Sequence, residues 1–191
     1  MDTDLILTYS VYEDYPVVTR SARLVQKGDQ KIRLENVMSA AVEFPDMDYE
    51  MIHLSGAWAR ERYVKTRKLE MGIQAVQSLA GTGSSSEQNP FIALKRPHTT
   101  EDTGEVFGFS FVYSGNFLAQ VEVSTYEMTR VMMGINPQGF SWELSRDEEF
   151  QTPEVVMVYS DKGLNGMSQA YHRLYLSLIH ISEPTRRRGI S

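Results

Sequence analysis

The sequence of 191 residues contains no cysteine. Disulfide bonds, thiolate nucleophiles and cysteine-based zinc sites are therefore excluded. A chain without thiols fits a reducing compartment, and we expect a cytoplasmic location. The sequence also shows no secretory leader, because Met1 to Asp4 is acidic where such a leader carries positive charge.

Long apolar runs and a surplus of basic residues are also missing. No stretch approaches the roughly 20 apolar residues that a membrane helix needs, so we expect no membrane partner. The 19 Lys and Arg against 25 Asp and Glu give a net charge of −6. Because phosphate neutralisation supplies most of the affinity for nucleic acid, we expect no nucleic-acid partner either. With 41% hydrophobic and 23% charged residues, the chain can bury the core of one domain, or of part of a larger one.

Short alternating segments predict a mainly β fold. Apolar and polar side chains alternate from Leu5 to Tyr12, which is the two-residue period of a strand. Further strands are expected at 15–25, 32–44, 49–54, 58–68, 91–94, 106–113, 117–123, 130–135 and 155–159. The turn at 27–30 predicts that 15–25 and 32–44 pair as a hairpin. Loops are expected at 80–90 and 96–104, and the many short strands indicate a sandwich or a large open sheet.

One segment departs from the strand period. Leu164, Met167, Tyr171 and Leu174 are spaced at i, i+3, i+7 and i+10, which is one face of a helix. We therefore predict a helix over 163–175, with Asp161 as its N-cap.

Residue types that could carry catalysis are present, but their patterns do not favour it. The acidic pairs lie in predicted turns, where solvated charge is the ordinary role: Asp46 with Asp48, Glu101 with Asp102, and Asp147 with Glu148 and Glu149. The histidines, His53, His98, His172 and His180, lack the spacing of zinc ligands. Ser84–Ser86 lacks a nucleophile elbow and Gly81–Gly83 lacks a phosphate-binding lysine. We expect no catalytic residue, metal site or cofactor in this chain.

The strongest binding signal is the segment His53-Leu-Ser-Gly-Ala-Trp-Ala-Arg-Glu-Arg62. In an extended segment Trp58, Arg60 and Arg62 would share one face, because they are two residues apart. An indole beside small residues offers a platform for the apolar face of a sugar, and arginines can bind its hydroxyl groups. The alternatives are a tryptophan packed in the core and an exposed strand edge with extended arginines.

Two other aromatic segments favour structural roles. Trp142 lies among alternating residues in Phe140–Leu144, and we expect it to pack in the core. Tyr113–Phe117 is expected to be a plain hairpin turn, with Gly115 and Asn116 at positive φ.

Several long segments follow one another in the order typical of bacterial α-galactosidases of glycoside hydrolase family 36, and the chain resembles that family over about residues 4–175. The segments are 14–23, 53–62, 89–91, 108–123, 134–137, 140–144, 152–161 and 163–175. The loop at 81–90 departs from the Arg-Gly-Ala-Ser-Ser-His version usual in the family, which leaves its local contacts open.

The resemblance implies a β-supersandwich of the galactose-mutarotase type, which precedes a catalytic (β/α)8 barrel in that family. It also implies hydrolysis of terminal α-galactosides such as melibiose and raffinose, with retention of configuration. The family's nucleophile and acid/base are aspartates of the barrel, which agrees with the absence of a candidate carboxylate pair here. Carried over from the family motif, Trp58 would contact the substrate, and the intact enzyme would be a homo-oligomer.

The resemblance divides the chain into three parts. Residues 1–161 would form a partial sandwich whose first strands lie outside the sequence, and 162–175 a helix leading toward the barrel. Residues 176–191 do not resemble the family and look like translated sequencing-adaptor DNA, so we expect them to be non-biological.

Two other functions stay open. A free-standing carbohydrate-binding module would have a complete sandwich with its own aromatic platform. Relatives that act on N-acetylgalactosamine or transfer galactosyl groups would differ in the barrel, so this sequence does not distinguish them.

Overall fold

The structure, a computed structural model, describes residues 2–81 and 87–181, with side chains through residue 178. Most of these residues lie in strands, which are followed by the helix α2. In chain order the elements are β1 (Thr3–Val11), β2 (Val17–Gln26), β3 (Ile32–Leu34), β4 (Met38–Phe44), β5 (Glu50–Ala57), β6 (Arg60–Lys68), β7 (Gly72–Ser78), β8 (Gln88–Lys95), β9 (Val106–Phe111), β10 (Phe117–Val123), β11 (Thr129–Ile135), β12 (Trp142–Leu144), β13 (Glu149–Gln151), β14 (Val155–Ser160) and α2 (Gly163–Ile181).

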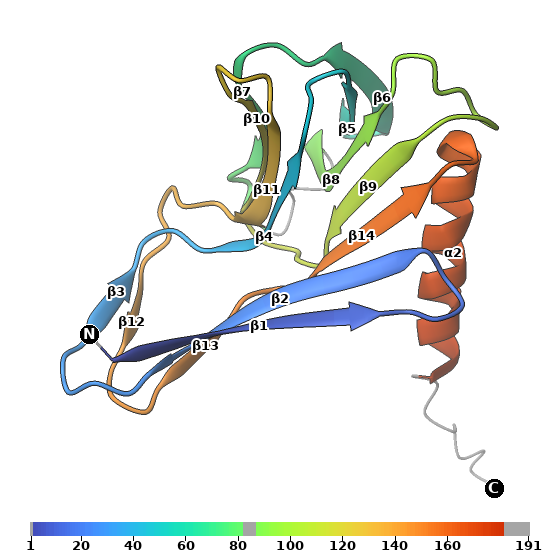
Figure 1. Cartoon of the computed structure of the whole chain (residues 1–191). Coiled ribbons are helices and arrows are strands. Elements are labelled where there is room, and N and C mark those ends of the chain that lie inside the picture. The colour runs from blue at the N-terminus through green and yellow to red at the C-terminus, as the bar shows by residue number, and fades with distance from the viewer. Residues whose placement is uncertain (1, 82–86, 182–191) are drawn as a thin grey trace, which may run out of the picture.

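The strands form two facing sheets and a small third one. The larger sheet has the order β1-β2-β14-β9-β8-β5-β6, with β13 paired to β2. The smaller sheet has the order β4-β11-β10-β7, and β12 pairs with β3 in the two-stranded sheet. In Figure 1 the smaller sheet lies over one end of the larger one, and β3, β12, β13 and the adjoining ends of β1 and β2 extend away from it as an arm. The prediction of a mainly β, sandwich-like fold is confirmed.

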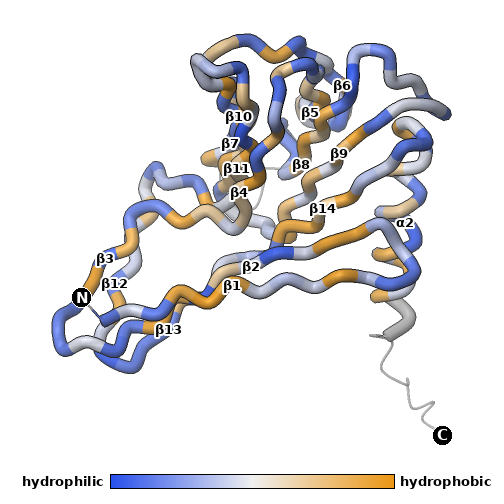
Figure 2. Tube along the Cα trace, viewed as in Figure 1, coloured by the Kyte–Doolittle hydropathy of each residue, from blue (hydrophilic) through white to orange (hydrophobic). Residues whose placement is uncertain are grey.

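The larger sheet is apolar on both faces at its centre. Met51, Leu94 and Phe109 point into a core shared with the smaller sheet, where Phe117 and Val121 are fully buried. Ile52, Ala93 and Val156 point the other way, toward α2. Figure 2 accordingly shows hydrophobic colour along β8, β9 and β14. Neighbouring residues of one strand thus serve two cores, so the fold has three layers: sheet, sheet and helix.

Helix α2 packs on the larger sheet through the face that the sequence predicts. Met167, Tyr171 and Leu174 are buried and Leu164 is partly buried. The phenol of Tyr171 donates a hydrogen bond to the carbonyl oxygen of Val156 at 3.1 Å. This bond ties the helix to the start of β14.

The start of α2 is held by backbone groups rather than by Asp161, so the prediction of that N-cap is wrong. The N–H groups of Gly163, Leu164 and Asn165 donate to the carbonyl oxygens of Gly104, Thr100 and Glu101, at 2.8–3.1 Å. Gly163 has φ 66°, and a Cβ there would lie 2.5 Å from two of those oxygens. The loop 96–104 therefore takes the place of a side-chain cap.

The predicted hairpin of 15–25 with 32–44 is also wrong. The second segment divides into β3 and β4, which belong to different sheets and pair with β12 and β11. Close to the division, β4 is bulged: Met133 and Gly134 of β11 pair with Ala40 and Met38, so Ser39 is the extra residue. A Cβ at Gly134 would lie 2.6 Å from the carbonyl oxygen of Val37, so only glycine allows this approach.

The segment Tyr113–Phe117 is a crossing between sheets and not a hairpin turn. Strand β9 before it belongs to the larger sheet and β10 after it to the smaller one. Gly115 and Asn116 do not have positive φ. Asn116 instead accepts a hydrogen bond from Gly81 N–H at its Oδ1, 2.7 Å away.

Strand β7 has no counterpart in the sequence prediction, because its buried face is partly polar. Gln74, Val76 and Ser78 face inward, whereas Ile73 and Ala75 are exposed, so the apolar residues of the sequence do not mark the buried face. The expected strand 91–94 is longer, since β8 begins at Gln88. Most of the loop expected at 80–90 lies outside the described residues.

The inner face of the larger sheet continues beyond the smaller sheet. Leu5, Leu7, Tyr9 and Val11 form a row on β1 and are 44–77% exposed. Beside this row lies an apolar cavity of about 470 Å³, whose lining includes Val18, Val42, Phe44 and Met157. Among the described residues no element covers this part of the sheet. Strand β1 is also an edge with nine consecutive register pairs to β2 and no bulge.

The contact between α2 and β9 depends on Gly108. A Cβ at this position would lie 2.8 Å from Met167 Sδ and 2.9 Å from the Tyr171 ring. We predict that Gly108→Ala lowers the free energy of unfolding by about 1–3 kcal/mol, because the helix must move off the sheet. Urea denaturation of the 191-residue chain measures this.

Gly28→Ala is the matched control, since the nearest atoms to its Cβ lie 3.5 Å away. Its effect should stay within about 0.5 kcal/mol. Equal stability of the two variants would contradict the proposed packing.

Candidate functional site

Trp58 stands at the tip of the β5–β6 hairpin. Trp58 and Ala59 form the two-residue turn between the paired residues Ala57 and Arg60. Ala59 has φ 64°, and its N–H donates to Oε1 of Glu61 at 3.1 Å. The Trp58 side chain is 87% exposed, so it is not packed in the core that the described residues form.

A bulge below the tip fixes the shape of the hairpin. The register between β5 and β6 shifts between Ser55 and Ala57, and Arg62 has φ 62°. A Cβ at Gly56 would lie 2.3 Å from the carbonyl oxygen of Arg60 and 2.8 Å from Cα of Glu61. Glycine is therefore required at position 56, and the bulge re-aims the side chains that follow it.

The prediction that Trp58, Arg60 and Arg62 share one face of a regular strand is wrong. Trp58 belongs to the turn, and the bulge at Arg62 interrupts the two-residue period. Of the three, Arg62 lies over the outer face of the larger sheet, where it lines a cleft with Leu54 and Val64. The tip thus presents the indole alone, with the Arg62 guanidinium lower on the hairpin.

Trp142 does not pack in the core as expected. It is 49% exposed, pairs with Leu34 in the two-stranded sheet, and lies 5.5 Å from the Phe150 ring centroid. Among the described residues, β12 pairs only with β3 in a two-stranded sheet, so the indole is left partly exposed.

His53 lies buried at the base of the same hairpin. It is 2% exposed on the inner face of β5, and neither ring nitrogen has a hydrogen-bond partner in the part of the chain that the structure describes. Its cross-strand neighbour on β6 is Lys65, with Arg67 two residues farther along. Burial lowers the pKa of His53, and the charges of Arg67 and Lys65 lower it further. The imidazole is therefore held neutral.

Arg96 links three segments, and the sequence analysis did not single it out. Its guanidinium binds both carboxylate oxygens of Asp46, at 2.6 and 3.1 Å, and lies 4.0 Å above the Tyr49 ring. It also contacts Glu105 at 3.4 Å. The hydrogen bond from Arg96 lowers the pKa of Asp46. Asp46 is therefore held in an ion pair, where the sequence predicts a solvated carboxylate. Its partner Arg96 directly follows β8 and is 50 residues away in the sequence.

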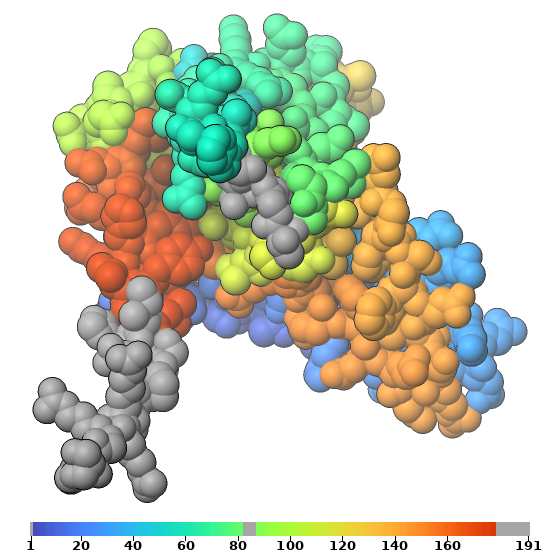
Figure 3. Space-filling view, turned by 180° about the vertical axis from the view of Figure 1, so that it is seen from behind, coloured from blue at the N-terminus to red at the C-terminus, as the bar shows by residue number. Residues whose placement is uncertain are grey.

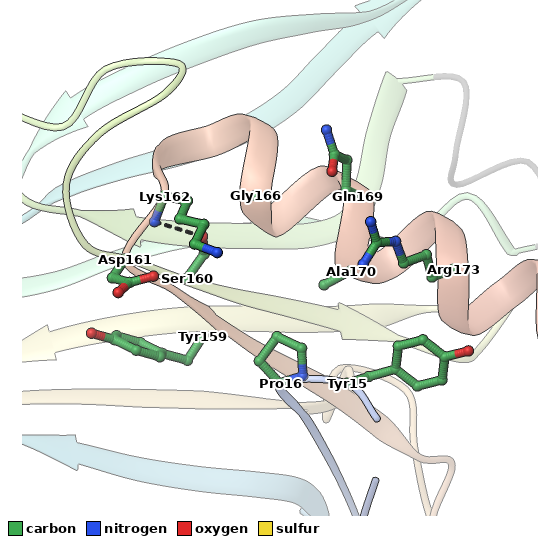
Figure 4. A pocket seen from close by; sticks show the side chains of 10 residues that line it. All are labelled: Tyr15, Pro16, Tyr159, Ser160, Asp161, Lys162, Gly166, Gln169, Ala170 and Arg173. Atoms are coloured by element: carbon green, nitrogen blue, oxygen red, sulfur yellow. Dashed lines mark hydrogen bonds between the residues drawn. The ribbon is translucent and has the colours of Figure 1, made fainter. Parts of the chain in front are cut away.

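Two clefts flank helix α2. One, of about 460 Å³, is shown in Figure 4: Tyr15 and Pro16 face Gln169 and Arg173 across it, and Lys162 N–H donates to Ser160 Oγ at 3.0 Å. The other, of about 580 Å³, lies between α2 and the outer face of β5, β6, β8 and β9. We call it the α2 cleft, and its lining includes Leu54, Arg62, Val64, Phe91, Tyr171 and Tyr175.

Within residues 2–81 and 87–181, no group of three or more His, Asp or Glu side chains could hold a metal ion. None of the helical segments there is long and apolar enough to cross a membrane.

These features define a class: a β-sandwich domain with an aromatic residue at the tip of a rigid hairpin. The N-terminal domain model of glycosyl hydrolase family 36 matches residues 1–145, and the melibiase model matches residues 149–190. The chain therefore belongs to glycosyl hydrolase family 36, in its N-terminal domain, as the resemblance predicts.

Individual relatives are α-galactosidases. The chain is 56% identical over 172 residues to α-galactosidase AgaA of Geobacillus stearothermophilus and 46% identical over 177 residues to α-galactosidase 1 of Pediococcus pentosaceus. These matches cover 90% and 93% of this chain. The crystal structure of the Geobacillus enzyme superposes with a TM-score of 0.88 over 91% of this chain, at 55% identity. An α-galactosidase of Lactobacillus brevis gives the same TM-score at 40% identity. The chain spans about a quarter of the length of these relatives, 23–24%.

The buried imidazole predicts an acid-sensitive fold. The pKa of His53 is lower in the folded state than the ordinary 6.5, so the unfolded chain takes up its proton first as the pH falls. Stability is then complete above about pH 6.5 and decreases below it, by up to about 1.4 kcal/mol per pH unit. Urea denaturation at intervals between pH 7.5 and 5.5 tests this.

His53→Leu should flatten the profile in that range, whereas His98→Ala, at an exposed position, should leave it steep. A wild-type profile that stays flat, or that the His53 variant does not change, would contradict the assignment.

Proposed function

We propose that the chain is the N-terminal part of an α-galactosidase, and that Trp58 forms part of the wall of its galactose site. The observation that carries this is the placement of Trp58: it is exposed at the tip of a hairpin whose shape Gly56 and the bulge determine. An indole held outward in this way presents a flat apolar face to a sugar ring.

The relatives support the choice of substrate. Two variants of the Geobacillus stearothermophilus enzyme have been solved, one in complex with stachyose and one in complex with raffinose. Both are α-galactosides, so we propose terminal α-galactosides of this type as the substrate of the whole enzyme, hydrolysed with retention of configuration.

The reacting carboxylates are proposed to lie in a catalytic barrel beyond these residues. Within the described ranges, each candidate pair or group has at least one carboxylate that is engaged by another side chain. Asp46 is bound by Arg96, Glu149 by Arg23, and Asp102 by Asn165. None of these pairs leaves two carboxylates free to face each other across a sugar.

A free-standing carbohydrate-binding module is less well supported. Such a module buries its own inner faces, whereas Leu5, Leu7, Tyr9 and Val11 are exposed on the inner face of the larger sheet. The surface fits a domain that is covered by further polypeptide. Specificity for galactose or N-acetylgalactosamine depends on the proposed barrel, so we make no choice between them.

We propose three parts for the chain: a partial sandwich over residues 1–161, a connecting helix over 162–175 and an adaptor-derived tail over 176–191. Helix α2 continues through the boundary at 175, and Leu176 and Leu178 are exposed on it, at 57% and 43%. An exposed apolar end of this kind fits an adaptor-derived tail, although the melibiase model runs to residue 190. Genomic DNA that reads from Leu176 onward within one longer gene would refute that origin.

The whole enzyme is further proposed to be cytoplasmic and homo-oligomeric and to work without a cofactor. The absence of cysteine agrees with the location. Cell fractionation and light scattering of the whole enzyme test these points, and an extracellular or monomeric enzyme would overturn them.

The 191-residue chain alone should release no nitrophenol from a nitrophenyl α-galactoside. The physical reason is that it supplies a contact to the sugar but neither reacting carboxylate. An activity that copurifies with the chain and is lowered by Trp58→Ala would show that the catalytic groups lie within it.

In the whole enzyme, Trp58→Ala should lower kcat/KM for raffinose by about tenfold, equivalent to ~1.4 kcal/mol of lost transition-state contact. Trp142→Ala is the matched control, because that indole packs on Phe150 in the arm. It should change kcat/KM by less than twofold. Equal kcat/KM values for the two variants would show that Trp58 does not contact the substrate.

A further inference from the structure

The α2 cleft has the chemistry of a sugar site and is separate from the Trp58 tip. Its floor is apolar and is formed by both the sheet and the helix, with Leu54 from β5, Phe91 from β8 and Tyr171 from α2. Val64 of β6 lines the cleft at an exposed position. Its rim is polar and carries Arg62, Asn89, Glu101, Ser168 and His172. Its volume of about 580 Å³ lies within the range of small-molecule sites. Figure 3 shows α2 and the β6 segment next to each other on this face.

The aromatic side of the cleft is held in place. The Tyr171 and Tyr175 rings are stacked at 6.1 Å with 13° between their planes, and Phe91 meets Tyr171 edge to face at 5.9 Å. The Tyr175 hydroxyl lies 3.2 Å from Ser110 Oγ. Tyr175 is still 37% exposed, so part of its ring is open to a ligand.

The polar rim is free to bind. Arg62, Glu101, Ser168 and His172 have no side-chain partner among the described residues. These groups include donors and acceptors of both charge signs, which suits hydroxyl groups better than a single strong charge. Arg62 is positioned by a left-handed backbone, at φ 62°. Strained residues of this kind are kept where the surrounding structure uses them, and ligand sites are a common case.

We propose that the α2 cleft binds a neutral oligosaccharide, with a sugar ring on Tyr175 and hydroxyl groups on Arg62 and Asn89. The choice of galactosides as the ligand rests on the proposed function. The cleft itself rests only on this chain's residues. The α2 cleft then binds sugar units other than the one that contacts Trp58, so the domain makes two separate sugar contacts.

The test is a titration of the isotope-labelled 191-residue chain with stachyose, followed by amide and side-chain NMR shifts. We expect saturable shifts at Phe91, Tyr175 and Arg62, with a dissociation constant in the millimolar range. Galactose should bind more weakly, by about fivefold, because it fills less of the cleft and loses about 1 kcal/mol of contact.

Tyr175→Ala and Arg62→Gly should each weaken stachyose binding by at least about fivefold. Glycine adopts the left-handed conformation of position 62 freely, so Arg62→Gly removes the guanidinium and keeps the bulge. Gln169→Ala is the matched control on the other flank of the same helix and should bind as the wild type does. Unchanged thermal unfolding shows that each variant is folded.

Shifts absent with stachyose, or equal binding by Tyr175→Ala and Gln169→Ala, would overturn the proposal. Binding that is lost in Trp58→Ala and retained in Tyr175→Ala would place the ligand at the hairpin tip. That outcome overturns the cleft site and leaves the proposed function standing. Conversely, stachyose binding in the cleft together with normal kinetics of Trp58→Ala in the whole enzyme would overturn the proposed role of Trp58 and leave the cleft site standing.

Discussion

The arrangement of the molecule depends on the central strands of the larger sheet, which are apolar on both faces. In β5 and β8, Met51 and Leu94 enter the core between the sheets, while Ile52 and Ala93 face α2. A shift of register by one residue would exchange these two sets, so the pairing of the strands is strongly specified. The hairpin that carries Trp58 is an extension of this fixed pairing. Its position relative to α2 is therefore set by the core.

The hairpin itself adds local rigidity to that frame. Gly56 allows the close approach of Arg60 and Glu61, and Glu61 in turn binds the turn N–H of Ala59. Because the tip is shaped before any ligand binds, little conformational entropy has to be lost on contact with a sugar. The same bulge places Arg62 over the α2 cleft. One backbone feature thus accounts for both the outward indole and the polar rim below it.

Sequence patterns predict the parts of this fold that depend on local periodicity. The face of α2 and most strand cores follow from the spacing of residues such as Met167 and Leu174. The pairing of 32–44 is not predictable in this way, because β3 and β4 find their partners more than 80 residues away. The roles of Arg96 and Gly108 are hidden for the same reason, since each depends on a contact between distant segments. For the site, the small and charged residues around Trp58 in the sequence are enough to single out this residue. The bulge that orients the hairpin is not predictable from the sequence, because it depends on the close approach of Arg60 and Glu61 to Gly56.

The central claim is that Trp58 forms part of a galactose site. The most direct measurement is a crystal structure of the whole enzyme, expressed from the uninterrupted gene, with 1-deoxygalactonojirimycin bound. Our account predicts the indole of Trp58 in van der Waals contact with the ligand, at about 4 Å. A structure in which the ligand occupies the site and Trp58 points into solvent or into another interface would contradict it.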